Sequence, residues 1–304
     1  MSASAIKNVA VVGARGNVGR STVKVLSENG FQVTGLGRSS PGHNIPTGVS
    51  FITSDYSAAS FLEAFKGQDA VISTLSSTGP GALDLQKTVI DAAIASGVKM
   101  FFSSEFGVDT SDPSSPDFIP FLGGKIEILD YLKERQDKIS WVALITGMLF
   151  DWGLNIPGFG GWDLSARTAT IYDGGDIPFE ATTLDQVGRA IAQSLKNPEL
   201  TGNQFVYVNS FTLTQNKVLK ALESVTGERF TVSHSTVNEL WQGGAAQLKE
   251  GNGMGVLPMI AATVYGKGGG LANYSKNRGL WNEKIGLKQE NLEEVLKSLV
   301  AGPK

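Results

Sequence analysis

The sequence predicts an α/β protein in which a doubly wound parallel sheet is followed by a smaller C-terminal α+β lobe. Short β-branched runs alternate with amphipathic stretches in the first half, a glycine-spaced turn follows the first run, and the second half is less regular. Because strand–helix–strand crossovers are right-handed, this order gives a parallel sheet covered by helices on both faces. We expect the sheet domain at residues 1–152, extended by parts of 168–210, and the lobe mainly at 153–304.

The elements of the first half are expected in regular alternation. Each strand is short, apolar and rich in β-branched residues, as strands buried on both faces are. Each helix carries apolar residues at helical spacing, and Gly30 and Gly97 stand where the first and third helices should end. The expected strands are 6–12, 31–37, 49–53, 69–75, 98–102 and 139–145, and the expected helices are 20–29, 57–66, 82–96 and 123–135.

Fewer patterns are clear in the second half. His234 is expected to be an ordinary, partly buried histidine on a strand, and the shape of the glycine-rich stretches 251–255 and 266–270 cannot be assigned. The other expected elements are strands at 168–172 and 204–208, helices at 184–195, 213–225, 237–248 and 292–299, and a loop or hinge at 155–161.

The composition excludes several kinds of site. The 304 residues include no cysteine, so disulfides, thiolate catalysis and Cys-based zinc sites cannot form. His43 and His234 are the only histidines, and no metal site is expected. A net charge of −3 without a basic cluster argues against nucleic acids and anionic membranes as partners. With no signal peptide and no apolar run approaching about 20 residues, we expect a soluble, cytoplasmic protein.

A glycine-spaced turn joins the first expected strand to the first helix. Gly13, Gly16 and Gly19 follow one another at three-residue intervals. Glycines in such a turn let the chain bend sharply, let backbone N–H groups approach a pyrophosphate and let the helix pack close to the sheet. The helix N-terminus favours the anion. We therefore expect this segment, which includes Asn17 and Val18, to bind a dinucleotide.

The end of the second expected strand indicates which dinucleotide is bound. An NAD site typically has an acidic residue about 20 residues beyond the turn, which accepts from the ribose 2′-hydroxyl. Here the strand leads into Arg38 with no acid nearby, and its guanidinium matches a 2′-phosphate, which Arg15 could also reach. These features predict NADP(H). By position alone, we expect Asp55 to flank the adenine, and Thr74 and Ser76 to contact the ribose on the nicotinamide side.

Polar residues also follow the fifth expected strand. The segment Met100–Asp109 reads MFFSSEFGVD, and we expect Ser103, Ser104 and Glu105 at the mouth of the site with Phe106 behind them. Ser104 and Phe106 are predicted cofactor contacts, whereas Glu105 is expected to bond nearby backbone N–H groups.

Lys125 lies in the first turn of the helix that follows this segment. The helix dipole prefers an anion at that position. A conflict between a residue and its position is typical of functional sites. A lysine partly desolvated in an apolar pocket has a lowered pKa, closer to the operating pH of an enzyme. We therefore predict a functional role for Lys125 next to the cofactor.

These residues together resemble a known group of proteins. They are Gly13, Gly16, Gly19, Arg38, the SSEFG segment at 103–107, Lys125 and the TGMLFDWGL segment at 146–154. The chain resembles the isoflavone reductase and phenylcoumaran benzylic ether reductase group of the NmrA-like atypical short-chain dehydrogenases, best over residues 1–210. The resemblance implies a Rossmann domain, NADPH as cofactor, Lys125 as general acid/base and Phe106 beside the nicotinamide or substrate.

The chain departs from the pattern of this group in two places. Arg15 stands where the group's glycine turn often has threonine, and Ser103 stands where its reductases often have proline. Neither change removes a needed group. The chain has no Tyr-x-x-x-Lys motif, since Tyr131 is followed four residues later by Arg135. The proton for a reduction would therefore have to come from Lys125.

Aromatic and apolar residues near these motifs are expected to form the substrate pocket. They are Phe106, Phe121, Met148, Phe150, Trp152, Phe159 and Trp162. So many rings suit a flat, apolar metabolite that is aromatic or alkaloid-like. The predicted activity is the NADPH-dependent reduction of such a small-molecule secondary metabolite by a monomer or a homodimer.

Two other functions are open at this point. The same pocket would suit an NADP(H)-binding enzyme that catalyses a non-redox cyclisation or isomerisation in a natural-product pathway. Some NmrA-like proteins are redox-sensing transcriptional regulators without catalysis. The resemblance implies that such members lack the lysine, so Lys125 counts against this second alternative.

Overall fold

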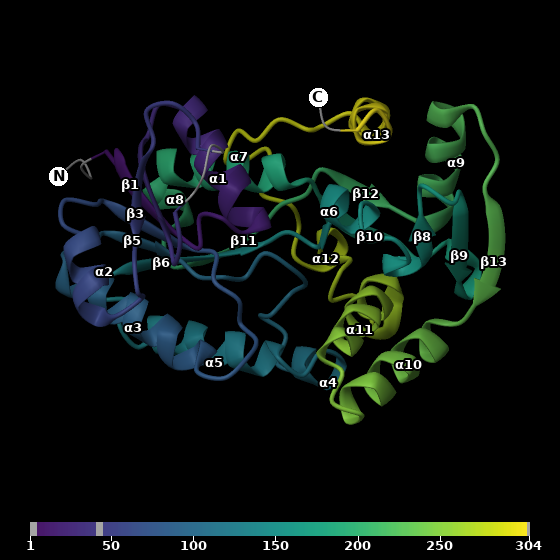
Figure 1. The fold of residues 1–304 in the computed structure, drawn as a ribbon, viewed down its shortest axis with the longest axis horizontal. Coiled ribbons are helices and arrows are strands. Elements are labelled where there is room, and N and C mark those ends of the chain that lie inside the picture. The colour runs from purple at the N-terminus through teal and green to yellow at the C-terminus, as the bar shows by residue number, and fades with distance from the viewer. Residues whose placement is uncertain (1–4, 41–44, 303–304) are drawn as a thin grey trace.

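A seven-stranded parallel sheet runs through one half of the molecule in the computed structural model, which describes residues 5–40 and 45–302 (Figure 1). Every pair of neighbouring strands is parallel. In spatial order the strands are β11 (Gln204–Tyr207), β6 (Ser140–Ile145), β5 (Met100–Phe102), β4 (Ala70–Ser73), β1 (Asn8–Val12), β2 (Gln32–Gly37) and β3 (Ser50–Thr53). The chain reverses its direction of travel across the sheet between β1 and β4, where ligands bind in folds of this kind.

Helices cover both faces of this sheet, which confirms the predicted doubly wound Rossmann fold. Along β1, Val9 and Val11 pack toward the helices of one face, and Ala10 and Val12 toward those of the other, as the period of two requires. The first face carries α1 (Asn17–Glu28) and α7 (Leu184–Lys196), and the second carries α2 (Ala58–Ala64), α3 (Ala82–Ala95) and α5 (Leu122–Lys133).

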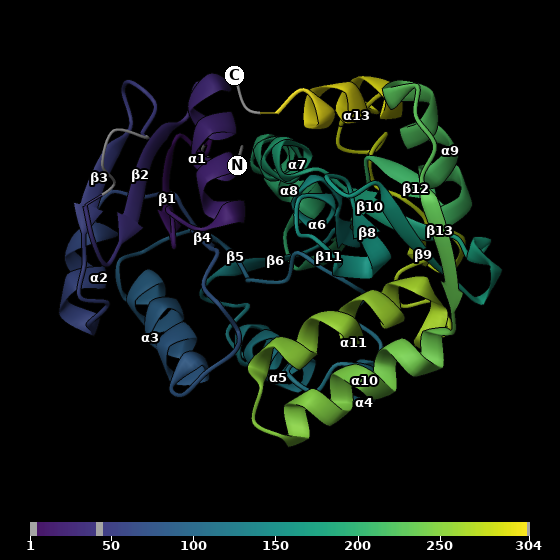
Figure 2. The ribbon, with the colours of Figure 1, turned by 45° about the vertical axis from the view of Figure 1, so that its right-hand side comes forward.

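Two small sheets and several helices form the rest of the molecule (Figure 2). One sheet contains β12 (Phe211–Leu213), β10 (Phe179–Thr182) and β7 (Met148–Leu149), and the other contains β13 (Thr231–Ser235), β9 (Thr168–Tyr172) and β8 (Trp162–Asp163). The longer helices are α9 (Gln215–Thr226), α10 (Val237–Lys249), α11 (Val256–Ala262) and α13 (Leu292–Val300). The short ones are α4 (Ser115–Phe118), α6 (Phe150–Leu154), α8 (Pro198–Thr201) and α12 (Tyr274–Asn277).

Several expectations for the second half need correction. The strand at 168–172 exists, but it lies in a small sheet, whereas β11 adds to the large one. The helix expected at 213–225 begins at Gln215, because Leu213 belongs to β12 and the Thr214 side chain caps the helix. His234 does lie on a strand, β13, but it is exposed, because β13 is an edge strand with little packed against it. His43 lies outside the described residues.

The helix α11 had no sequence prediction. It follows the glycine-rich stretch 251–255, whose last residues form a 3₁₀ turn, and it contains Pro258 in its first turn. Proline is tolerated there because the first N–H groups of a helix have no partner within the helix. The stretch 266–270 continues a π-turn and has positive φ angles at Gly266, Gly269 and Gly270.

Two kinds of feature are absent from residues 5–40 and 45–302. No helix there is both long enough and apolar enough to cross a bilayer. The same residues contain no cluster of three or more His, Cys, Asp or Glu side chains suited to a metal ion.

Candidate active site

The glycine turn lies at the carboxyl end of β1, beside the point where the strand order reverses. Gly13 has a φ of +83°, and a Cβ on it would lie 2.8 Å from the side-chain oxygen of Thr74. A Cβ on Gly19 would overlap the carbonyl oxygen of Gly13. Both positions therefore require glycine, the first for its backbone angle and the second because α1 packs directly on the turn.

The first turn of α1 is open to an anion. Gly16 precedes the helix, so no side chain caps its N-terminus, and the first turn contains no acidic residue. Gly16 and Asn17 are exposed and Val18 is half-buried against the sheet. Uncapped N–H groups at the positive end of a helix dipole suit the pyrophosphate of a dinucleotide. The residues present therefore fit the predicted cofactor.

The two predicted phosphate ligands have different surroundings. Arg15 donates to the side-chain oxygen of Ser39. Arg38 lies with its guanidinium carbon 5.9 Å from the centre of the Tyr56 ring. Among residues 5–40 and 45–302, neither arginine has a carboxylate within ion-pair distance. Both guanidinium groups therefore stay available for a phosphate or a base.

The predicted ribose and adenine contacts also lie at the strand ends. The exposed carboxylate of Asp55 accepts from the backbone N–H of Ser57 at 2.9 Å, and the hydrogen bonds from Ser57 lower its pKa. Thr74 Oγ1 donates to the carbonyl oxygen of Val12 at 2.8 Å. Ser76 Oγ accepts from the backbone N–H of Thr78 at 3.1 Å within an exposed turn. Their roles toward a cofactor stay predictions.

The segment after β5 is arranged differently from the expectation. Ser103 and Glu105 are buried behind the site rather than at its mouth, because Ser103 bonds the backbone of β6 and Glu105 accepts from Thr110 Oγ1 at 2.6 Å. Ser104 donates to the Leu75 carbonyl oxygen at 2.7 Å and is 9% exposed. Phe106 lines the cavity, in keeping with its expected place in the pocket wall.

Phe106 has a backbone conformation that non-glycine residues rarely adopt. Its φ is +36°. Hydrogen bonds hold the strained segment on both sides, from the Phe106 N–H to the Leu144 carbonyl and from the N–H groups of Thr146 and Gly147 to the Gly107 carbonyl. Strain of this kind persists only where the surroundings enforce it, and it clusters at functional sites. The strain therefore supports a functional role for Phe106.

Lys125 projects from the first part of α5 toward the same segment. The ammonium donates to the carbonyl oxygen of Glu105, and within the described residues it has no other hydrogen-bond partner and no ion pair. Burial lowers the pKa of Lys125 below that of an ordinary lysine, and the charge of Glu105 offsets part of this effect. The lysine is thus held by one neutral oxygen, which leaves its other protons free for a ligand.

A largely apolar cavity of about 200 Å³ lies in front of this ammonium. Lys125 is the only charged residue among those that line it in the described part of the chain. The lining residues are Phe106, Gly107, Val108, Ile119, Phe121, Leu122, Lys125, Gly147, Met148, Leu149, Trp152, Phe159, Ile260 and Val264. The cavity can hold an apolar group and present one proton donor to it.

The structure brings together Phe106, Phe121, Met148, Trp152 and Phe159 in this wall but not the other two predicted pocket residues. Phe150 is buried in the core with its ring centre 5.5 Å from that of Phe211. It lies two positions from Trp152 on α6, so the two side chains point to opposite faces of the helix. Trp162 is 1% exposed and donates to the Tyr265 hydroxyl at 3.1 Å, so it is also a core residue.

Other cavity residues were missed by the sequence reasoning. Ile119 and Leu122 lie close to Lys125 in the chain and are apolar, so the position of the lysine could have indicated them. Ile260 and Val264 come from the α11 region, more than 130 residues further along, and no local pattern connects them with the site.

Comparisons with known proteins identify relatives over most of the chain. The NmrA-like family matches residues 5–248. Oxidoreductase aprR of Aspergillus flavus is 36% identical over 302 residues, which cover 97% of this chain and 99% of that protein. Oxidoreductase poxI of Penicillium oxalicum is 28% identical over 290 residues, which cover 93% of this chain and 90% of that protein.

Solved structures show the same fold at low sequence identity. The ternary complex of leucoanthocyanidin reductase from Vitis vinifera has a TM-score of 0.78 at 17% identity, covering 97% of this chain and 99% of that one. AtPrR2 with NADP⁺ and (+)pinoresinol has a TM-score of 0.70 at 21% identity, covering 97% and 98%. Together with the family match and the 36% identical relative, these observations show that this chain belongs to the NmrA-like family.

Proposed function

We propose that this chain is an NADPH-dependent reductase of a small, largely apolar secondary metabolite, aromatic or alkaloid-like, and that Lys125 is its general acid/base. The observation that carries the proposal is the buried ammonium of Lys125 at an apolar cavity, at the end of the sheet that carries the glycine turn. The fungal relatives named as oxidoreductases support a redox reaction, and the neighbour with NADP⁺ and (+)pinoresinol supports this cofactor and an aromatic substrate.

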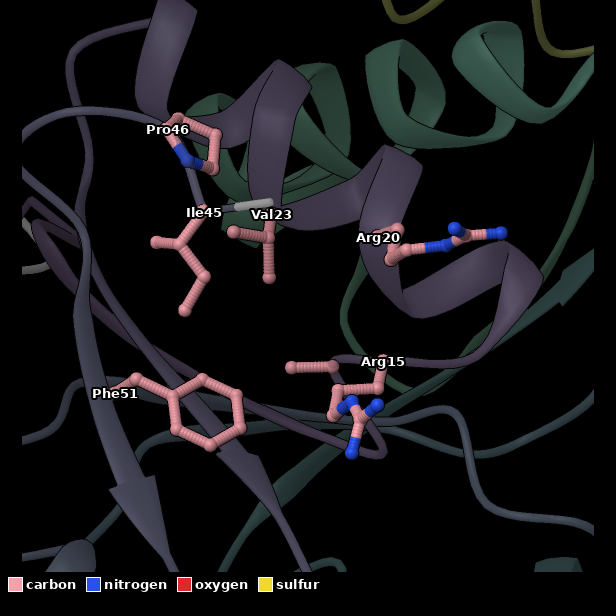
Figure 3. Close-up of a pocket in the computed structure, with 7 residues that line it drawn as sticks. Arg15, Arg20, Val23, Ile45, Pro46 and Phe51 are labelled. Carbon is pink, nitrogen blue, oxygen red and sulfur yellow. The ribbon is translucent and has the colours of Figure 1, made fainter. Parts of the chain in front are cut away.

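Residues of the glycine turn would hold the cofactor. Gly13 and Gly19 leave room for its close approach, and the uncapped start of α1 offers N–H groups to the pyrophosphate. Arg38, which follows β2, and Arg15 (Figure 3), whose side chain bonds Ser39 beside it, would hold the 2′-phosphate. When bound, NADPH supplies the hydride for the reaction.

Lys125 would donate a proton to the substrate atom that becomes negative when the neighbouring carbon is reduced. For a carbonyl group, carbon gains the hydride, oxygen gains the lysine proton, and Lys125 is protonated again from solvent. The lowered pKa of Lys125 eases this transfer, because less free energy is needed to remove the proton. The Glu105 carbonyl oxygen orients the ammonium by accepting one of its hydrogens.

The cavity limits what the substrate can be. A volume of about 200 Å³ lies below the roughly 300–1,000 Å³ of typical ligand sites. The cavity would therefore take one ring system of a larger metabolite, with the rest extending outward. The ring edges and faces of Phe106, Phe121, Trp152 and Phe159 suit an aromatic group.

Isotope transfer tests this proposal directly. The protein is incubated with NADPH deuterated at the transferred position and a pool of aromatic and alkaloid-like candidates, and products are analysed by mass spectrometry. We expect a product that carries one deuterium. A product without label and without loss of NADPH would instead support the non-redox cyclisation or isomerisation.

A pair of lysine variants tests the assigned residue. We expect Lys125→Met to keep NADPH binding and to lower turnover by about two to four orders of magnitude. Lys133→Met is the matched control, since it changes a half-exposed lysine at the other end of α5 that pairs with Asp130 at 2.9 Å. Turnover by Lys125→Met equal to that of the control would remove Lys125 from the mechanism.

A further inference from the structure

The carboxylate of Glu105 is a buried negative charge that no cation contacts directly. The residue is 2% exposed, and among the described residues the only hydrogen bond to its carboxylate comes from the buried Thr110, whose Oγ1 donates to it at 2.6 Å. Burying a carboxylate opposes folding unless hydrogen bonds and an opposite charge compensate for the lost water. One hydroxyl supplies only part of this compensation, so an opposite charge is needed nearby.

The ammonium of Lys125 bonds the same residue through its backbone and not through its carboxylate. It donates to the Glu105 carbonyl oxygen, and within the part of the chain that the structure describes the two charged groups form no ion pair. They still interact, because the charge of Glu105 raises the pKa of Lys125 while burial lowers it. Attraction between separated charges is strong where water is excluded. Each group is therefore a counter-charge of the other without direct contact.

The other charged residues near α5 do not take over this role. β6, which packs on α5, and α11, which lines the same cavity, contain no charged residue. On α3, α4 and α5 and in the segment after β5, the remaining charged side chains are paired, hydrogen-bonded or exposed to solvent, which weakens their effect. They are Lys87 with Glu127, Lys133 with Asp130, Arg278 with Asp109, Asp112 with Ser114, and the exposed Asp84, Asp91 and Asp117.

We propose that the Glu105 carboxylate is the counter-charge that keeps the buried ammonium of Lys125 protonated, and that Thr110 holds this carboxylate away from the ammonium. This inference rests on the proposed role of Lys125 as proton donor. Glu105 and Thr110 are positioning residues, since neither lines the cavity. A direct ion pair would engage the hydrogens that Lys125 needs for the substrate. After the lysine has given one proton to the substrate, the charge of Glu105 favours the uptake of another from solvent.

The titration of Lys125 can be followed by NMR without any substrate. The whole protein is isotope-labelled at the lysine Cε, and the signal that is absent from Lys125→Met identifies Lys125. We expect Glu105→Gln to lower the midpoint of this titration by about one pH unit or more, because a nearby opposite charge favours the protonated amine. Thr110→Val should raise the midpoint, because the released carboxylate can pair directly with the ammonium. Thr110→Ser keeps the hydroxyl and should keep the wild-type midpoint.

A second buried carboxylate provides the matched control. Glu180 on β10 is fully buried and accepts from Thr212 Oγ1 at 2.7 Å, as Glu105 does from Thr110. Neither Glu180 nor Thr212 lines the cavity of Lys125. Glu180→Gln and Thr212→Val should therefore leave the Lys125 midpoint unchanged. Circular dichroism of each variant verifies that it is folded.

The pH dependence of turnover gives a second readout once isotope transfer has identified a substrate. A proton donor acts only while it carries its proton, so kcat falls as pH rises through the pKa of the donor. We expect Glu105→Gln to move this fall to lower pH by about the same amount as the NMR midpoint, with KM unchanged. A merely structural role of Glu105 would not move it.

Equal Lys125 midpoints in Glu105→Gln and Glu180→Gln would overturn the inference. A midpoint in Thr110→Val equal to that in Thr212→Val would overturn the role of Thr110, and this comparison alone decides if Glu105→Gln does not fold. The proposed function fails separately, because it requires that Lys125→Met lowers turnover, whereas the midpoints are measured without substrate.

Discussion

Two adjacent glycines in α10 provide a test of how the wall of the substrate cavity is built. A Cβ on the exposed Gly243 would meet no heavy atom within 4 Å. A Cβ on the buried Gly244 would lie 2.5 Å from the carbonyl oxygen of Gly255 and 3.1 Å from the backbone nitrogen of Met259. These neighbours are backbone atoms at the start of α11, so they can yield only if the two helices move apart.

The free energies follow from this geometry. Each glycine-to-alanine change gains up to about 1 kcal/mol of helix propensity. Only Gly244→Ala also overpacks the contact between α10 and α11, which lowers the free energy of unfolding by about 1–3 kcal/mol. The propensity gain is common to both variants, so their free energies of unfolding should differ by about 1–3 kcal/mol. At about 2 °C per kcal/mol for a chain of this size, their melting temperatures should differ by about 2–6 °C, with Gly243→Ala the higher.

Thermal unfolding followed by tryptophan fluorescence measures this difference. Separation of α10 from α11 should also displace Ile260, which lines the cavity, so Gly244→Ala should raise KM for the substrate while Gly243→Ala leaves it unchanged. Equal melting temperatures for the two variants would show that the α10–α11 contact is not as close as described.

Three other changes have expected outcomes. Lys125→Met should have a larger free energy of unfolding than the wild type in urea at pH 7, because the buried charge of Lys125 opposes folding below its lowered folded-state pKa. This difference in free energy should shrink as pH rises toward 10.5, because the lysine of the unfolded chain then loses its proton as well. A constant difference would contradict the lowered pKa. Gly19→Ala should abolish dinucleotide binding measured by calorimetry, because its Cβ overlaps the Gly13 carbonyl and displaces α1 from the turn; wild-type affinity would refute this. Arg278→Met should cost about 1–3 kcal/mol, because it removes the cation that lies 3.0 Å from the buried Asp109, and the double variant with Asp109→Asn should cost less than the sum of the single changes; additive losses would contradict the pairing.

Local patterns were sufficient for the first half of the fold. The strands of the large sheet up to β6, and the helices α1, α2, α3 and α5, were predicted to within a few residues, because buried parallel strands are continuous apolar runs and these helices have clear ends. The four-residue α4 was not predicted. The prediction was weaker where elements are short. The two-residue β7 and the five-residue α6 leave no periodic signal, so the opposite directions of Phe150 and Trp152 could not be seen.

The sequence placed some of the site residues correctly and others not. Gly13 and Gly19 were identified because a tight turn between a strand and a helix requires glycine. Lys125 was identified because the first turn of a helix disfavours a cation. Ser103 and Glu105 were expected at the mouth of the site, and only the structure shows that both side chains are buried.

The sequence by itself determined the parallel sheet, the glycine turn at its reversal point and the presence of a lysine at the start of α5, because each depends on residues close together in the chain. The tertiary structure decided which side chains meet Lys125. Ile260 and Val264 reach the cavity wall only through the packing of α11. Trp162 packs in the core, where its indole N–H bonds the Tyr265 hydroxyl. Burial, and with it the lowered pKa of Lys125, arises from these distant segments together, and no single stretch of the chain encodes it.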